Sequence, residues 1–106
     1  MATQKIITKN NYTISISDVG KHLLINSAFP ITIIVSSTGI PSDSEIMISN
    51  YGTGLVNFIS DNTAIIRSSN NELSISNQYD SVCLIKLNST ITGNNKEFLL
   101  IGAKRK

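Results

Sequence analysis

The sequence has few of the residues on which catalysis, metal binding and covalent cross-linking depend. Its 106 residues include one cysteine, one histidine, two prolines and no tryptophan, and 15% are charged, against about 25% in an ordinary soluble domain. The single Cys83 cannot form an intramolecular disulfide, and no cysteine or histidine near it in the sequence completes a metal-binding spacing. These absences predict a protein without redox chemistry, bound metal or cofactor.

Long apolar runs and strong charge are also missing. No stretch approaches the ~18 apolar residues of a membrane span, and the first twenty residues lack the basic segment and apolar run of a secretion signal. The net charge of +2 is too small to indicate a nucleic-acid or membrane partner. We expect a soluble, single β-domain over residues 1–106, with flexible termini at 1–3 and 103–106.

The sequence is rich in β-branched and small polar residues. Serine, threonine and asparagine fill 36 positions, and isoleucine, leucine, valine and phenylalanine fill 33, which is enough apolar content to bury a core. Eighteen isoleucines against four alanines favour strands over helices, because branching at Cβ restricts a side chain in a helix and suits a pleated sheet.

Alternation of apolar and polar residues with a period of two is the main structural pattern. It is clearest at residues 12–17 and 73–76, and further β-rich runs lie at 5–8, 22–26, 31–36, 45–49, 55–60, 64–67, 82–87 and 97–101. Glycine- and asparagine-rich turns separate these runs. The pattern predicts an all-β protein, a compact antiparallel β-sandwich or barrel of about ten short strands, with no helix longer than two turns.

Two segments, residues 82–85 and 98–101, are apolar on both faces of the expected strand. Each therefore needs a second partner, which is either a loop or the opposite sheet of the same chain, or a neighbouring subunit. The sequence leaves both possibilities open.

No pattern of catalytic residues stands out. His22 lies four residues after Asp18, but the Gly-x-Ser-x-Gly motif of a nucleophile elbow is absent and the carboxylates are scattered singly along the chain. Gly52-Thr53-Gly54 lacks the third glycine of a nucleotide-binding loop and suggests a hairpin turn instead. We therefore expect no enzymatic activity.

The three tyrosines are candidates for partner contact, because an aromatic ring with a polar tip suits a partly wet site. Alternation points Tyr12 inward, whereas Tyr51 and Tyr79 fall in turns where exposure is expected. These two residues are the candidates for contact with a glycan or a protein.

A succession of motifs runs from Tyr12 to Gly102, at residues 12–14, 18–23, 31–35, Pro41 with 44–46, 50–58, Gln78 with 81–86, and 98–102. This succession resembles a small β-domain that recurs in fibre, tail and capsid-decoration proteins of tailed bacteriophages. Phe98 stands where that family usually has tryptophan. The resemblance implies turn positions at Asp18, Gly20, Gly52, Gly54 and Gly102, and core positions at Ile14, Leu23, Phe58, Leu84 and Phe98.

The resemblance implies a non-enzymatic structural protein on the surface of a bacteriophage capsid or tail, assembled in the host cytoplasm. The kinds it suggests are capsid decoration, head fibre and tail accessory protein, commonly homotrimers that contact other virion proteins such as the major capsid or tail protein. We expect the trimer interface on one face of residues 82–87 or 97–101. The alternative is an adhesion module that binds a glycan or the host surface.

The last three residues, Lys104, Arg105 and Lys106, form the one cluster of charge in the chain. We expect this tail to project beyond the last strand. It is either a contact for an acidic patch on the larger particle or a solvated terminus, and the sequence does not decide between the two.

Overall fold

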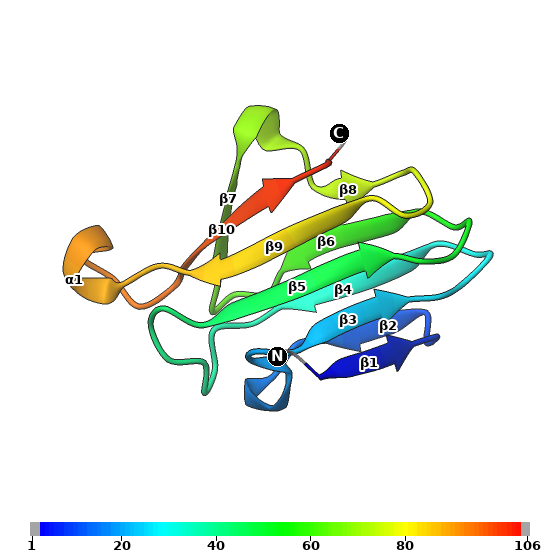
Figure 1. Ribbon diagram of the computed structural model, residues 1–106. Helices are drawn as coiled ribbons and strands as arrows, with labels where there is room; N and C mark the ends of the chain where they lie inside the picture. The colour runs from blue at the N-terminus through cyan, green and yellow to red at the C-terminus, as the bar shows by residue number, and fades with distance from the viewer. Residues whose placement is uncertain (1–2, 105–106) are drawn as a thin grey trace.

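A computed structural model describes residues 3–104, and nearly all of its regular elements are strands (Figure 1). Besides the strands, the described residues contain the four-residue helix α1 (Ser89–Thr92) and two short 3-10 turns, η1 (Ile16–Asp18) and η2 (Ser69–Asn71). The strands are β1 (Gln4–Ile7), β2 (Asn11–Thr13), β3 (His22–Ile25), β4 (Ile31–Val35), β5 (Glu45–Asn50), β6 (Val56–Ser60), β7 (Ile65–Ser68), β8 (Ser74–Ile75), β9 (Ser81–Lys86) and β10 (Glu97–Gly102).

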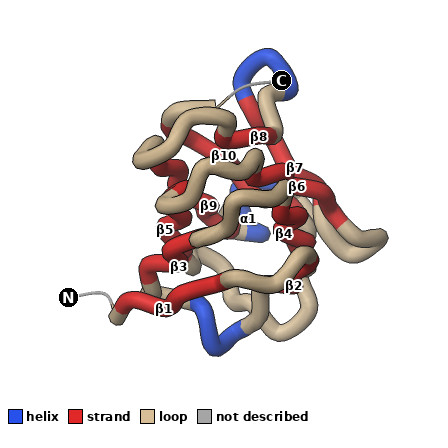
Figure 2. Tube along the Cα trace, turned by 90° about the vertical axis from the view of Figure 1, so that its right-hand side faces the viewer, coloured by secondary structure: helices blue, strands red, loops and turns tan. Residues whose placement is uncertain are grey.

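The strands form two sheets, and the chain passes from one sheet to the other at almost every turn. The six-stranded sheet has the order β1-β3-β5-β9-β10-β7, and the four-stranded sheet has the order β2-β4-β6-β8. Figure 2 shows β3 and β5 on one side of the molecule and β4 and β6 on the other. The first six strands therefore wind as a coil, in which each strand pairs with the strand two places earlier in the sequence.

This winding confirms the all-β class and the ten strands, but the expected antiparallel arrangement is wrong. Of the eight strand pairings among residues 3–104, five are parallel, and only β5–β9, β9–β10 and β6–β8 are antiparallel. A parallel pair usually needs a helical crossover. In four of the five parallel pairs the crossover is a strand of the opposite sheet, so no helix is needed; β7 and β10 are joined through β8, β9 and α1.

Nine of the ten predicted strands agree with the observed strands to within one residue at each end. The exception is the run at residues 12–17, where β2 ends at Thr13 and η1 begins at Ile16. The side chain of Asp18 accepts a hydrogen bond from the backbone N–H of Ser15, 3.0 Å away, and folds the chain back. This capping interaction takes precedence over the alternation of the segment.

One hydrophobic cluster fills the space between the sheets and receives side chains from both. The inward positions are nearly inaccessible to solvent in β3, β4, β5, β9 and β10. The five core positions implied by the resemblance are all buried, namely Ile14, Leu23, Phe58, Leu84 and Phe98.

The segment Gly52-Thr53-Gly54 is not a hairpin turn, because β5 and β6 lie in different sheets. It extends the pairing of β5 with β3: the N–H groups of Gly52 and Gly54 donate to the carbonyls of Ile25 and Ser27 at 3.0 and 2.8 Å. A Cβ at either glycine would collide with the backbone of Ser27 or Phe29. Glycine is needed here for close approach of two backbones rather than for a positive φ.

The C-terminal tail also differs from expectation where it is described. The Ala103 N–H donates to the carbonyl of Ser81 at 3.1 Å, and Lys104 is buried rather than projecting beyond β10. The other two tail residues, Arg105 and Lys106, lie outside the described residues, as do residues 1 and 2.

Candidate binding surface

The outward face of the six-stranded sheet carries an unusual number of apolar side chains. Met47 lies opposite Cys83 in the pairing of β5 with β9, and Cys83 lies opposite Ile101 in the pairing of β9 with β10. Met47 and Ile101 are 47% and 44% exposed, and Cys83 between them is half-buried. We call these three residues the outer apolar row.

The outer apolar row explains the two segments that are apolar on both faces. Their inward residues are buried in the core, and their outward residues Cys83, Ile85, Leu99 and Ile101 are half-buried or exposed. The opposite sheet therefore covers one face of each strand, and the other face is accessible to solvent in the single chain.

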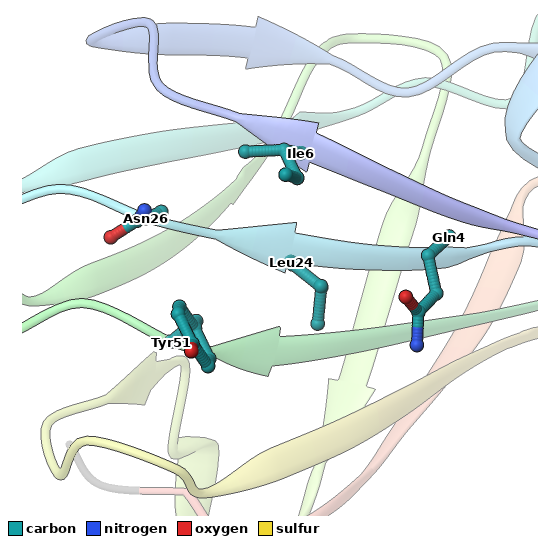
Figure 3. Close-up of a pocket in the computed structure, with 5 residues that line it drawn as sticks. All are labelled: Gln4, Ile6, Leu24, Asn26 and Tyr51. Atoms are coloured by element: carbon teal, nitrogen blue, oxygen red, sulfur yellow. The ribbon is translucent and has the colours of Figure 1, made fainter.

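A shallow pocket of about 410 Å³ lies on the same face, toward the β1 edge (Figure 3). Gln4 and Ile6 reach it from β1, Leu24 from β3, Asn26 from the residue after β3, and Tyr51 from the residue after β5. Each of these side chains is uncharged. The pocket therefore combines two amides, two aliphatic groups and one aromatic ring.

The structure brings the two candidate tyrosines together beside this pocket. The rings of Tyr51 and Tyr79 meet edge to face, with 5.8 Å between centroids and 69° between planes, and they are 52% and 69% exposed. The Tyr51 N–H donates to the Ile25 carbonyl at 2.9 Å, and the Tyr79 N–H donates to the Asn50 carbonyl at 2.6 Å. These backbone hydrogen bonds thus fix both residues at one end of the sheet.

His22 takes part in a chain of hydrogen bonds that the sequence did not indicate. Its Nε2 lies 2.7 Å from the Ser49 hydroxyl, which is also hydrogen-bonded to the Ser81 hydroxyl. A serine hydrolase needs a carboxylate on the second ring nitrogen of such a histidine and a donor pair for the oxyanion. Within residues 3–104 no carboxylate forms a hydrogen bond with His22.

A second polar cluster, also missed by sequence reasoning, closes the β1 end of the molecule. The wholly buried Asp18 carboxylate accepts hydrogen bonds from the Tyr12 hydroxyl at 2.7 Å and from Lys5 Nζ at 3.1 Å, and Lys5 Nζ also donates to the Tyr12 hydroxyl at 2.7 Å. Burial raises the pKa of Tyr12, so its hydroxyl remains a donor at neutral pH. The cluster ties β1, β2 and η1 together.

Lys86 is a third polar residue that the sequence did not single out. It points into the core, where Nζ donates to the Ile40 carbonyl at 2.9 Å and to Asn95 Oδ1 at 3.2 Å and lies 5.6 Å from the centre of the Phe98 ring. Burial lowers the pKa of its ammonium group. Lys86 thus joins two loops to β9 and is inaccessible to solvent.

The described residues contain neither a metal-binding cluster nor an activated thiol. Residues 3–104 contain no group of three or more histidine, cysteine, aspartate or glutamate side chains placed to hold a metal ion. Burial, with a smaller contribution from Glu45, raises the pKa of Cys83 and keeps its thiol protonated at neutral pH.

No protein-family model and no curated protein matches the chain. Across residues 3–104 no helix reaches the length and apolar content that crossing a membrane requires.

Proposed function

We propose that this chain is a non-enzymatic structural protein on the surface of a bacteriophage particle, a capsid-decoration, head-fibre or tail accessory protein. The single observation that supports the proposal is the outer apolar row of Met47, Cys83 and Ile101, which runs across three adjacent strands. Exposed apolar side chains that adjoin one another in a contiguous patch are typical of surfaces that bind another protein.

The proposed arrangement is a homotrimer that buries the outward face of β9 and β10 together with Met47 of the neighbouring β5. Complete burial of an aliphatic side chain is worth roughly 1.5–3 kcal/mol, and Met47 and Ile101 are about half buried in the single chain. Each would then contribute roughly 1 kcal/mol per subunit. The threefold symmetry comes from the resemblance to phage virion domains.

We class the fold as a β-sandwich rather than a barrel, because among the described strands no backbone pairing joins an edge of one sheet to an edge of the other. Such a module, with a neutral surface of hydroxyl and amide groups, suits an exposed position on a virion.

The test is protein mass spectrometry on purified particles of the virus whose genome encodes the chain. The proposal expects the chain at a copy number in fixed ratio to the major capsid or tail protein. Absence of the chain from particles washed free of lysate would contradict it.

A second candidate function is adhesion to a glycan or the host surface, and the observation that favours it is the exposed Tyr51–Tyr79 pair beside the pocket. The matched test compares binding of Tyr51→Ala to whole cells with binding of Ile91→Ala. Ile91 is exposed on α1, which lies at the opposite end of the sheet from the tip of β5 (Figure 1). Adhesion predicts loss of binding with Tyr51→Ala alone.

A further inference from the structure

We infer that the pocket between β1, β3 and Tyr51 is a binding site for a single uncharged pyranose. The Tyr51 ring would stack on the apolar face of the sugar, and the Gln4 and Asn26 amides would bond its hydroxyls. The inference deepens the second candidate function and rests on it.

The apolar part of the pocket suits the C–H face of a sugar ring. Ile6 and Leu24 lie on neighbouring strands and point to the outward face, and the Tyr51 ring stands beside them (Figure 3). An aromatic ring with a polar tip binds well where one side of the ligand is apolar and the other is wet.

The polar part of the pocket suits hydroxyl groups. Gln4 and Asn26 each offer an amide oxygen as acceptor and an amide nitrogen as donor. Both side chains are exposed, and neither makes a hydrogen bond within residues 3–104. A ligand can therefore form hydrogen bonds with these two amides without breaking a hydrogen bond within the protein.

The charge and size of the pocket narrow the ligand class. All five lining side chains are uncharged, so a sialic acid, a phosphorylated sugar or a peptide carboxylate would lose its hydration without gaining a counter-charge. A volume of about 410 Å³ is near the small end of the ~300–1,000 Å³ of small-molecule sites. The pocket therefore fits one sugar residue of a longer glycan.

The ring that would stack is already positioned. The N–H groups of Tyr51 and Gly52 both donate to the Ile25 carbonyl, at 2.9 and 3.0 Å, and Gln78 Nε2 donates to the Tyr51 carbonyl at 3.0 Å. The edge-to-face contact with Tyr79 supports the ring from one side. Binding would therefore need little ordering of the protein.

The experiment is an NMR titration of the ¹⁵N-labelled protein with the methyl glycosides of glucose, galactose, mannose and N-acetylglucosamine, and with methyl sialoside. We expect at least one neutral glycoside to shift the amide signals of residues 4, 6, 24, 26 and 51, with a dissociation constant on the order of 1 mM. The sialoside should leave them unchanged.

Variants identify the site and keep the result interpretable. Tyr51→Ala is expected to weaken binding about tenfold, the equivalent of one lost stacking contact, and Gln4→Ala, on a different strand, to weaken it severalfold. Ile91→Ala should bind as the wild type does.

The inference is overturned if none of the four glycosides shifts the pocket signals, if Tyr51→Ala binds as tightly as Ile91→Ala, or if the sialoside binds as tightly as the neutral sugars. Cell binding that persists without sugar binding would overturn the pyranose site and leave adhesion standing. The presence of the chain in particles is measured separately, so the structural proposal stands or falls on its own.

Discussion

The substitution Asp18→Ala should be among the most destabilising single changes in this protein, although the residue is polar and lies in a turn. The Asp18 carboxylate is wholly buried and accepts hydrogen bonds from Ser15 N–H, the Tyr12 hydroxyl and Lys5 Nζ. Alanine would leave the part-buried Tyr12 hydroxyl and Ser15 N–H without this acceptor and would release η1 from β2.

The magnitude follows from the three contacts taken separately. A hydrogen bond to a charged group contributes about 1.5–3 kcal/mol, so the contacts to Ser15 and Tyr12 together account for roughly 3–5 kcal/mol after allowance for overlap. The Lys5 side chain is 39% exposed, and solvent screening limits that ion pair to about 1 kcal/mol or less. We therefore expect a loss of about 3–5 kcal/mol for Asp18→Ala and less than about 1 kcal/mol for Lys5→Met.

The assay is urea denaturation followed by far-ultraviolet circular dichroism, with Lys5→Met as the matched control. Since an ordinary domain is stable by about 5–15 kcal/mol, a loss of this size should be plain at 25 °C. A cost below about 1 kcal/mol for Asp18→Ala, or an equal cost for Lys5→Met, would show that the contacts of Asp18 to Ser15 and Tyr12 do not stabilise the fold as described.

Three further predictions concern the hydrophobic core, the close approach of the Gly54 and Phe29 backbones, and stability in acid. Phe98→Ala should cost about 3–5 kcal/mol in urea denaturation, because it removes a buried ring, and a cost under about 1 kcal/mol would mean that the ring is not in the core. Gly54→Ala should destabilise the protein by more than the ~1 kcal/mol at which single substitutions centre, because its Cβ would meet the Phe29 backbone; a neutral result would contradict the close approach of the two loops. Hydrogen bonds from Thr63 lower the pKa of Asp61, and hydrogen bonds from Arg67 and then Asn94 lower the pKa of Glu97. The folded protein thus binds fewer protons than the unfolded chain in acid. The stabilisation by these two carboxylates should be present above about pH 4.5 and should be lost as the pH falls below their ordinary pKa values, 4.5 for Glu97 and 3.8 for Asp61. Thermal melting at a series of pH values measures this loss, and a melting temperature that does not change with pH in this range would contradict the prediction.

The sequence predicted strands well because burial of one face leaves a period-two pattern in the chain itself. Phe58 and Phe98, core positions implied by the resemblance, are buried, and Tyr51 and Tyr79, which were expected in exposed turns, are exposed. Alternation says nothing, however, about which strand pairs with which. The parallel coil depends on where each connection leads, and a short glycine-rich loop can close a hairpin or cross to the other sheet.

The polar clusters could not be predicted from the sequence, for a related reason. Asp18, Tyr12 and Lys5 occupy ordinary positions in the sequence, and only the packing of β1 against β2 and η1 joins their side chains. Lys86 occupies an inward strand position, where alternation predicts an apolar residue. A charged residue at an apolar position was the one available signal for that site.

Multi-angle light scattering at micromolar concentration measures whether the protein assembles through the outward face of the six-stranded sheet. The wild type should give about three times 11.5 kDa, and Met47→Glu with Ile101→Glu should give the monomer mass. The matched control is Ile59→Glu, which changes a side chain that is 50% exposed on β6 of the other sheet and should leave the trimer intact. A monomeric wild type, or a trimer that survives the double substitution, would rule out this interface.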